Sequence, residues 1–306
     1  MNIRKKVISV GNFDGLHIAH KNILDFIKRY AKYTDCEALI YTFENHPKEF
    51  FTNESVPNIL LEDEKKEMLS LYGVNVFIRK FDKYFANLSA EDFILHELIS
   101  EHNLAALVIG DDHKFGKGRH CGNECLKDLS KKYNFEYYQL DSVFVDGERV
   151  SSTAIRNHIK NGNILSANKM LGYRYFVRGK VIAGTQIGRK IGFPTANIKV
   201  DSRKLLPQIG VYSSICIVDG RKYPAMLNIG YKPTVSNDKK VGIEVHIIDF
   251  YGDLYEKNIK VKFLQKIRDE KQFNNIEELK NQLIEDKKVS LKIYQNVLKK
   301  KEIFNI

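Results

Sequence analysis

Residues 6 to 20 read Lys6-Val7-Ile8-Ser9-Val10-Gly11-Asn12-Phe13-Asp14-Gly15-Leu16-His17-Ile18-Ala19-His20, an apolar run followed by a glycine-bracketed turn. The run Lys6–Val10 fits a buried strand, and the amphipathic pattern of Ala19–Lys32 predicts a helix. A turn that joins a strand to a helix lies at the carboxyl end of that strand. Open α/β sheets bind ligands at this end. The first twenty residues therefore predict an α/β fold with a binding turn.

The same alternation of apolar runs and helical patterns continues to about residue 140. The predicted strands are Lys6–Val10, Cys36–Phe43, Val74–Arg79, Ala105–Gly110 and Phe135–Leu140. The predicted helices are Ala19–Lys32, Glu62–Tyr72, Ala90–His102 and Asn123–Tyr133. Ser89 is the expected N-cap of the third helix, with Asp92 at its third position. Strands that alternate with helices predict a doubly wound parallel sheet that is covered on both faces.

The pattern changes after about residue 170. The β-rich segments there are Tyr175–Ile182, Val211–Val218, Arg221–Leu227, Val241–Phe250 and Ile259–Gln265, and one amphipathic helix, Ile276–Leu298, follows. Strands at short spacing without helices between them favour an antiparallel β-barrel. Two short helices around Asn161-Gly162 would form the join, over Ser151–Gly172. We therefore expect two domains, residues 1–170 and residues 171–306.

The composition is that of an ordinary globular protein. Hydrophobic residues make up 43% and charged residues 28% of the 306, and the mean hydropathy is -0.35. These values exclude disordered and collagen-like classes. The longest apolar stretch, Leu104–Ile109, is far shorter than the roughly 20 residues that cross a bilayer. The sequence predicts a cytoplasmic protein without a membrane partner.

Charge is distributed unevenly. The first 150 residues hold 20 basic and 24 acidic side chains, which leaves -4, whereas the other 156 hold 29 and 14, which leaves +15. A basic half indicates an anionic partner, either nucleic acid or a small phosphorylated substrate. Because no dedicated nucleic-acid motif is found, we expect the small substrate and no nucleic acid. The oligomeric state does not follow from the sequence.

The four cysteines are Cys36, Cys121, Cys125 and Cys216. Without a secretion signal, free thiols are the expectation. A zinc site near His113 and His120 is the alternative, but the Cys121-x3-Cys125 spacing fits the usual zinc knuckles poorly.

The turn after the first strand carries chemistry of its own. Gly11 and Gly15 allow the backbone to approach a ligand closely. His17 and His20, three residues apart, lie on one side of the first helical turn. Together with the free amides of the helix N-terminus they predict an anion site suited to a polyphosphate.

Four segments resemble, in order, the signature elements of the bacterial FAD synthetases, a family of the nucleotidyltransferase superfamily. They are Gly11–His20 (similar to His-x-Gly-His), Thr42-Phe43-Glu44-Asn45-His46-Pro47, Gly110-Asp111-Asp112-His113-Lys114-Phe115-Gly116-Lys117-Gly118-Arg119 and Val150-Ser151-Ser152-Thr153-Ala154-Ile155-Arg156. The resemblance implies that the phosphate of FMN attacks the α-phosphorus of ATP and releases pyrophosphate. It implies His17, His20 and Arg156 as catalytic groups. The nucleotide-binding residues that it implies are Gly11, Phe13, Asp14, Gly15, Asp111, Ser152 and Thr153.

A second candidate site begins the β-rich half. Glycine recurs at 179, 184, 188 and 192, with Arg189 and Lys190 among them. Glycine-rich backbone with cations suits a phosphate-binding loop, although the Walker A spacing is missing. The segment Pro194-Thr195-Ala196-Asn197 that follows presents a hydroxyl and an amide oxygen, which suit Mg²⁺.

This half resembles the riboflavin kinase domain of the same bifunctional family. The matching segments are Gly179–Asn197, Gly210-Val211-Tyr212, Asn228-Ile229-Gly230-Tyr231-Lys232-Pro233-Thr234, Glu244-Val245-His246, Tyr255, Ile267-Arg268 and Phe273. The resemblance implies Glu244 as the general base for the riboflavin 5′-hydroxyl. It implies Thr195 and Asn197 as the Mg²⁺ and phosphate ligands, and the nucleotide-binding set Gly184, Gly188, Arg189 and Gly192.

The two resemblances together predict an enzyme that converts riboflavin to FMN and FMN to FAD with MgATP. Three positions depart from the family pattern, namely Ala19, Asn45 and His113, and all lie in the first domain. A chain in which only the kinase half is efficient is therefore the alternative among enzymes, and a nucleic-acid-binding protein is the alternative of another class.

Overall fold

The structure is a computed structural model that describes residues 4–44, 47–52, 55–111, 115–184, 187–231 and 241–299. The chain divides into two compact units, Met1–Ser152 and Thr153–Ile306. Each unit has its own sheet and its own buried core. We describe the units one at a time.

The first unit contains a five-stranded parallel sheet, as predicted. Its strands are β1 (Lys6–Val10), β2 (Glu37–Phe43), β3 (Asn75–Arg79), β4 (Leu104–Gly110) and β5 (Glu136–Leu140), in the order β3-β2-β1-β4-β5. The chain order reverses between β1 and β4, because β2 and β3 lie to one side of β1 and β5 lies beyond β4. Such a reversal opens a crevice at the carboxyl ends of the two strands.

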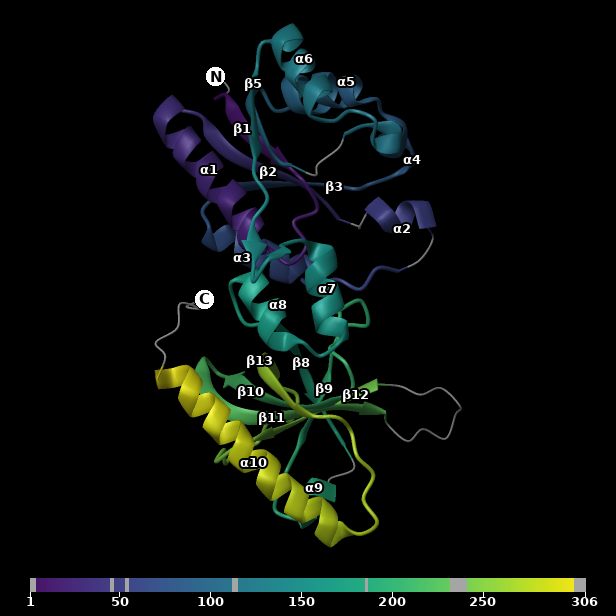
Figure 1. Ribbon diagram of the computed structural model, residues 1–306, viewed down its shortest axis with the longest axis vertical. Helices are drawn as coiled ribbons and strands as arrows, with labels where there is room; N and C mark the ends of the chain where they lie inside the picture. Colours follow the sequence, from purple (N-terminus) through teal and green to yellow (C-terminus); the bar gives the residue numbers. More distant parts are fainter. Residues whose placement is uncertain are drawn as a thin grey trace. The chain divides into compact units, whose positions relative to one another are not determined.

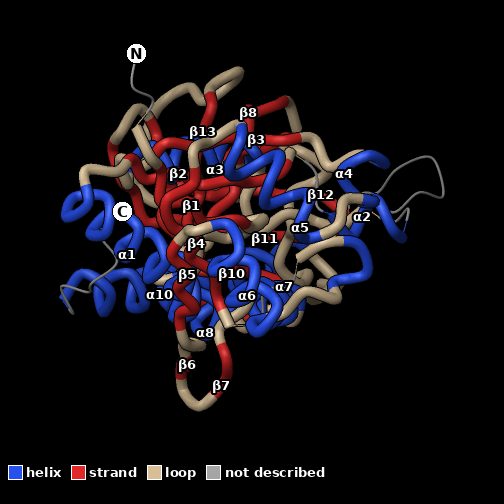
Figure 2. The backbone as a smooth tube through the Cα atoms, turned by 90° about the horizontal axis from the view of Figure 1, so that it is seen from above, coloured by secondary structure: helices blue, strands red, loops and turns tan. Residues whose placement is uncertain are grey.

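Helices cover both faces of this sheet (Figures 1 and 2). They are α1 (Ile18–Thr34), α2 (Pro47–Thr52), α3 (Glu62–Leu71), α4 (Lys83–Asn87), α5 (Ala90–Asp92), the π-helix η1 (Phe93–Ser100), the short 3₁₀ turn η2 (Lys117–Arg119) and α6 (Asn123–Tyr133). The core on one face joins alternate strand residues such as Ile8 and Val10 to η1 and α6. Helix α1 packs against β1, β2 and β4 through Leu24 and Ile27, which are fully buried.

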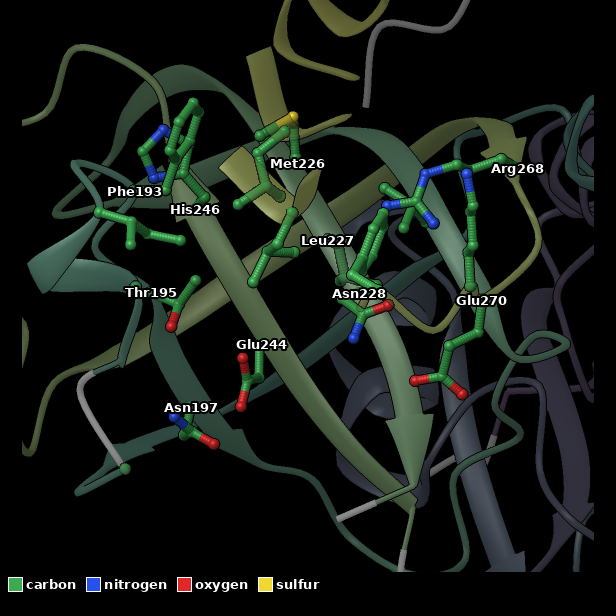
Figure 3. A pocket seen from close by; sticks show the side chains of 18 of the residues that line it. Phe193, Thr195, Asn197, Met226, Leu227, Asn228, Glu244, His246, Arg268 and Glu270 are labelled. Atoms are coloured by element: carbon green, nitrogen blue, oxygen red, sulfur yellow. The ribbon is translucent and has the colours of Figure 1, made fainter. Parts of the chain in front are cut away.

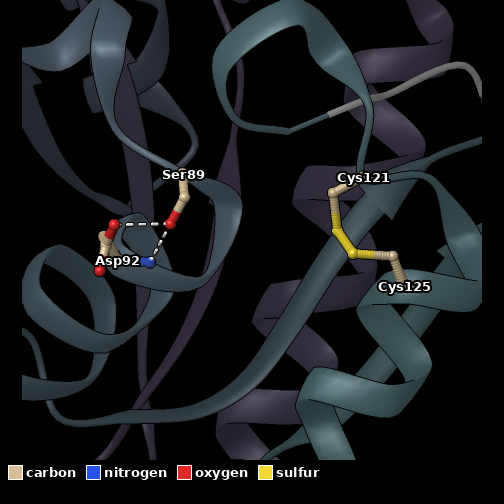
Figure 4. The surroundings of a disulfide bond; sticks show 4 residues. All are labelled: Ser89, Asp92, Cys121 and Cys125. Carbon is tan, nitrogen blue, oxygen red and sulfur yellow. Dashed lines mark hydrogen bonds between the residues drawn. A yellow bond between two sulfur atoms is a disulfide. The ribbon is translucent and has the colours of Figure 1, made fainter.

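The helix expected over Ala90–His102 starts as predicted and then changes type. The Ser89 hydroxyl accepts from the Asp92 amide at 3.0 Å, which confirms the N-cap (Figure 4). From Phe93 onward the helix is a π-helix, in which hydrogen bonds span one residue more than in an α-helix. Glu97 in this segment accepts from the buried Tyr41 hydroxyl at 2.7 Å and pairs with Arg79 at 3.1 Å.

The second unit contains a closed antiparallel barrel, as predicted (Figure 1). Its strands are β8 (Phe176–Ile182), β9 (Ala196–Lys199), β10 (Gly210–Val218), β11 (Arg221–Tyr231), β12 (Val241–Ile247) and β13 (Asn258–Arg268), in the order β10-β11-β12-β9-β8-β13. Strand β9 was not predicted, because its four residues follow a glycine-rich loop and Pro194. The small hairpin β6 (Phe144–Val145) and β7 (Glu148–Arg149) of the first unit and the one-turn helix α9 (Ile187–Lys190) were also not predicted.

Two predicted helices precede the barrel and one follows it. They are α7 (Ser152–Lys160), α8 (Ile164–Leu171) and the 24-residue α10 (Ile276–Lys299). Asn168 in α8 donates its side-chain amide to the Phe263 carbonyl of β13. The buried Ser290 in α10 donates its hydroxyl to the Ala225 carbonyl of β11 at 3.0 Å. Within the residues described, no helix combines the length and the apolar character needed to cross a membrane.

The expectation of four free thiols is wrong for two of them. Cys121 and Cys125 form a disulfide, with their Cα atoms 5.3 Å apart (Figure 4). Cys121 precedes α6 and Cys125 lies in its first turn, and the two Cα atoms come within the range that a disulfide spans. Cys36 and Cys216 are free, and burial raises the pKa of the Cys216 thiol to about 12.

We predict that Asn168→Ala destabilises the second unit by about 2 kcal/mol or more, since an unpaired buried polar group costs about 1–3 kcal/mol. The Asn168 amide donates to the Phe263 carbonyl at 3.1 Å and its oxygen accepts from the Tyr175 amide at 2.7 Å. Alanine leaves both backbone groups buried and unpaired. Urea unfolding monitored by tyrosine fluorescence measures the change. Asn157→Ala, at an exposed position of α7, is the matched control and should unfold like the unaltered protein.

Candidate functional site

The turn after β1 is tightly constrained. Phe13, Gly15 and Leu16 have φ angles of 51°, 85° and 38°, so three residues of a four-residue segment are left-handed. Such a conformation is unfavourable for Phe and Leu. Both side chains are almost fully buried, at 2% and 0% exposure, and this burial offsets the strain. The turn is therefore held in one conformation at the crevice of the sheet.

Asp14, predicted to bind nucleotide, holds the protein's own backbone. Its carboxylate is 3% exposed and accepts from the amides of Ile59 and Leu60 at 3.2 and 3.0 Å. Ser152 donates its hydroxyl to the Asp14 carbonyl at 2.8 Å. The structure thus brings the first and last of the four sequence segments of this unit into contact.

His17 and His20 lie together, as predicted, but as neutral imidazoles. Their rings stack with centroids 3.6 Å apart. Burial lowers the pKa of His17 from 6.5 to about 4. Burial also lowers the pKa of His20, and the neighbouring charges of His17 and Lys65 lower it further. His17 is the N-cap of α1, and its Nδ1 atom accepts from the His20 amide at 3.4 Å. This bond leaves the proton on Nε2.

Asp111 lies at the end of β4, across the crevice from the turn after β1. Its carboxylate pairs with Arg149 in β7 and accepts from the Ser142 hydroxyl. The carboxylate thereby fastens the β6–β7 segment to the end of the sheet. His113 and Asn45, two positions that depart from the family pattern, and His46 lie outside the described residues.

Thr153 and Arg156 lie on α7, in the part of the chain that belongs to the second unit. Thr153 is exposed and Arg156 is half-buried. Their role at the first site stays a prediction.

In the barrel, the predicted base lies in a row of side chains that runs across five strands. Strand register pairs Arg268 with Val211, Val211 with Asn228, Asn228 with Glu244, and Glu244 with Asn197. Paired residues of neighbouring strands point to the same face. Figure 3 shows the Glu244 carboxylate between Asn197 and Asn228.

A cavity of about 690 Å³ lies over this row. The barrel strands, the glycine-rich loop and α10 all contribute to it. Its lining comprises Ala183, Gly184, Gly188, Ile191, Phe193, Thr195, Asn197, Val211, Met226, Leu227, Asn228, Glu244, His246, Arg268, Glu270, Lys271, Phe273, Leu279 and Leu283. The structure therefore brings together five of the residues predicted for the second site. Arg189 and Gly192 are on the same loop, exposed, but outside the lining.

The glycine at 188 is required by close approach of the backbone. A Cβ atom there would lie 2.2 Å from the Phe193 carbonyl oxygen. The Phe193 amide donates to the Gly188 carbonyl at 2.8 Å, which closes the loop just before Thr195. Thr185 and Gln186 lie outside the described residues.

Two of the cavity residues that were not predicted to have a role make hydrogen bonds that support the site. His246 Nδ1 lies 2.8 Å from the Pro194 carbonyl oxygen, which joins the strand of the base to the Pro-Thr-x-Asn segment. Arg268 forms a bidentate pair with Asp286 of α10, at 2.8 to 3.1 Å, and Asp286 is 1% exposed. Strand alternation from Glu244 identifies His246, but no local pattern identifies the partner of Arg268.

The oxygen donors near Glu244 fit a hard cation. Thr195 offers a hydroxyl, and Asn197 offers an amide oxygen one strand away from the carboxylate. Mg²⁺ prefers such ligands and keeps several waters or phosphate oxygens. Over the described ranges, no group of three or more His, Cys, Asp or Glu forms a metal cluster.

Comparison with protein families gives two matches, one for each unit. The family model of FAD synthetase matches residues 1–154, and that of riboflavin kinase matches residues 171–294. Residues 155–170 fall between the two matches.

Curated relatives resemble the whole chain. The bifunctional riboflavin kinase/FMN adenylyltransferase of Buchnera aphidicola is 35% identical over 95% of this chain and 94% of its own length. That of Escherichia coli K12 is 35% identical over 92% and 90%. A solved structure titled as a macrolide-efflux protein, from Streptococcus pneumoniae, has a TM-score of 0.86 at 31% identity and covers 94% of each chain.

We predict that the stability of the first unit depends on pH through His17. The folded pKa of about 4 lies below the ordinary 6.5, so the unfolded chain binds a proton that the folded chain excludes. Stability is therefore fully present above pH 6.5 and falls by roughly 3 kcal/mol as the pH decreases to about 4. Urea unfolding from pH 7 to pH 4 measures this slope. His17→Asn, which keeps an N-cap but does not titrate, should reduce the slope and leave the part that His20 contributes; an unchanged slope would contradict the assignment.

Proposed function

Because the chain belongs to the family of bifunctional riboflavin kinases/FMN adenylyltransferases, we propose that each reaction has a site of its own, on the residues described above. The protein phosphorylates riboflavin to FMN and adenylylates FMN to FAD. ATP is the donor in both reactions. We assign the kinase to the barrel and FAD synthesis to the parallel sheet, and we propose a functional boundary at residues 170 and 171, beyond the division of the two compact units after Ser152.

The row Asn228, Glu244 and Asn197 beneath the cavity is the observation that carries the kinase assignment. Glu244 accepts the proton of the riboflavin 5′-hydroxyl. The oxygen of that hydroxyl forms a bond to the γ-phosphorus of ATP. The bond between that phosphorus and the β–γ bridging oxygen breaks, and ADP leaves. Positioning and charge neutralisation supply most of the acceleration in such transfers.

The neighbouring loop is the proposed phosphate site. Backbone amides around Gly184, Gly188 and Gly192 would surround the phosphates, with Arg189 as an added cation. Thr195 and Asn197 would hold Mg²⁺. When bound, the ion neutralises phosphate charge. His246 keeps the Pro194 carbonyl beside the strand of the base, so the metal ligands and Glu244 stay in register.

In the first unit the nucleophile is the ionised phosphate of FMN, which needs no general base. Its oxygen bonds to the α-phosphorus of ATP, the α–β bridging bond breaks and pyrophosphate leaves. His17 and His20 are proposed to act as neutral N–H donors toward the departing phosphates, consistent with their lowered pKa values. Gly11, Phe13 and Gly15 would shape the nucleotide turn.

The remaining proposed residues either bind a phosphate or support the segments around the first site. Arg156 would clamp a phosphate with its planar fork, assisted by Thr153. Ser152 and Asp14 support the turn through their hydrogen bonds, and Asp111 fastens the loop opposite.

We also propose a cytoplasmic location and no nucleic-acid partner. Both reactions consume ATP. The phosphorylated substrates are anionic, and they are sufficient to account for the excess of basic residues in the second half of the chain. A preparation that retains DNA or RNA in a strongly salt-dependent way would contradict the second proposal.

We predict that single substitutions separate the two activities. Glu244→Gln keeps the shape of the side chain but removes the base, so riboflavin phosphorylation should fall about 10²-fold or more. His17→Asn should lower FAD synthesis from added FMN and leave the kinase intact. Separate chromatographic time courses of FMN and FAD measure both reactions in each variant. Each variant serves as the folding control for the other. Loss of FAD synthesis in a folded Glu244→Gln protein would disprove the two-site assignment.

We predict that Gly188→Ala raises the KM for ATP in the kinase reaction about tenfold, because sub-ångström misplacement of binding groups is costly. The new methyl group must displace the Phe193 carbonyl and, with it, the segment that presents Thr195. Initial rates at varied ATP measure the effect. FAD synthesis in the same protein should not change, and an unchanged KM for ATP would exclude the proposed phosphate loop.

A further inference from the structure

Lys65 is a buried cation in the first unit. It lies on the second turn of α3 within the charged run Glu62-Asp63-Glu64-Lys65-Lys66. Its exposure is 5%, whereas Lys66 beside it is exposed and pairs with Glu62 at the surface. A lysine is seldom buried unless its charge has a role or a partner.

The ammonium group of Lys65 has its donors fully occupied. It donates to the Asn12 carbonyl at 3.1 Å, the Thr42 hydroxyl at 3.2 Å and the Phe43 carbonyl at 3.2 Å. An ammonium group has three N–H donors, so none is left for a nucleotide. Lys65 therefore acts through the protein and not by touching substrate.

These acceptors come from the ends of two adjacent strands. Asn12 follows β1 in the turn that leads to His17, and Thr42 and Phe43 end β2. Here the turn is the acceptor side, and in a second set of bonds it again accepts: the Asp14 carboxylate accepts from the amides of Ile59 and Leu60, just before α3. A carboxylate and an ammonium thus fix the turn and α3 to each other by separate hydrogen bonds.

We propose that Lys65 is a positioning residue for FMN adenylylation, which holds the turn that carries His17 and places a fixed positive charge behind it. This inference rests on the proposed role of His17 and His20. It explains why a charge is retained in a site where three neutral oxygens are its direct partners. It also extends the site to a helix that none of the four sequence segments includes.

The electrostatic surroundings support a charge that is close to titration. Burial lowers the pKa of Lys65 to about 8; Asp14 and Glu62 raise it in part, and Lys66 lowers it. On α1, the positive charge of Lys65 contributes to the lowered pKa of His20. Among the described residues, the groups whose charge interacts with that of Lys65 are therefore Asp14, Glu62, Lys66 and His20.

The first test compares Lys65→Met, which removes only the ammonium from a chain of similar length, with Lys66→Met on the exposed side. FAD synthesis from FMN should lose on the order of 10²-fold in kcat/KM in K65M, the scale of a small misplacement of catalytic groups. K66M should equal the unaltered protein. Riboflavin phosphorylation in the barrel should be the same in all three. NMR titration of the histidines should place the midpoint of His20 higher in K65M, a change that a packing role would not produce.

The second test uses pH. A required cation with a pKa of about 8 predicts that kcat/KM for FAD synthesis falls as the pH rises through that value, since kcat/KM reports groups of the free enzyme. Lys65→Arg keeps its charge at alkaline pH. It should recover part of the activity that K65M loses and show no alkaline decline over this range.

Each outcome supports or overturns the proposal. Equal kcat/KM values for FAD synthesis in folded K65M and K66M overturn it. So does an equal loss of both reactions with a lower melting temperature, which would indicate a structural role alone. If K65M does not fold, an alkaline profile of the unaltered protein without a decline near pH 8 overturns it. If the unaltered protein makes no FAD, that result would instead reject the assignment of FMN adenylylation to the first unit.

Discussion

Strand register is the constraint on which the kinase half depends. Glu244 faces the cavity because β12 pairs in register with β11 on one side and β9 on the other. A slip of one residue would turn Glu244 into the core and bring Val245 to the cavity. The hydrogen bond between His246 and Pro194 adds a side-chain contact to this pairing, beyond the end of the backbone ladder. Catalytic geometry in the barrel thus follows from backbone hydrogen bonding.

The first unit reaches a defined geometry by other means. Its site is a short strained turn, and neither the strand before it nor the helix after it fixes the conformation. The conformation of the turn is held by several independent contacts. They are the burial of Phe13 and Leu16 and the hydrogen bonds of the Asp14 carboxylate and the Lys65 ammonium. Strain of this kind persists only where the surroundings compensate for it, and it occurs often at functional sites. The same burial keeps both imidazoles neutral, so the protein supplies donors without adding charge there.

Much of this architecture was predictable from the chain, because periodicity and local capping are local properties. The β1 turn, the Ser89 cap and the barrel class are of this kind. The short strand β9 was missed because Ala196–Lys199, although its residues alternate between apolar and polar, is too short to predict a strand by itself, and its partner β12 is distant in the sequence. Lys65 was missed for a related reason: a run of charges usually marks a solvated helix face, and only the tertiary fold buries one member. The Cys121–Cys125 disulfide was contrary to expectation, because the sequence shows the four-residue spacing but not the approach of the two Cα atoms to 5.3 Å.

The two sheets differ in how they end. Each barrel strand has a neighbour on both sides, so the described part of the second unit offers no free sheet edge for another chain to pair with. The parallel sheet ends at β3 and β5, each with a sheet neighbour on one side only. When chains crowd during synthesis or partial unfolding, edge-to-edge association therefore begins in the parallel-sheet unit. An aggregate seeded this way would retain a folded barrel, and with it the capacity to make FMN after FAD production has been lost.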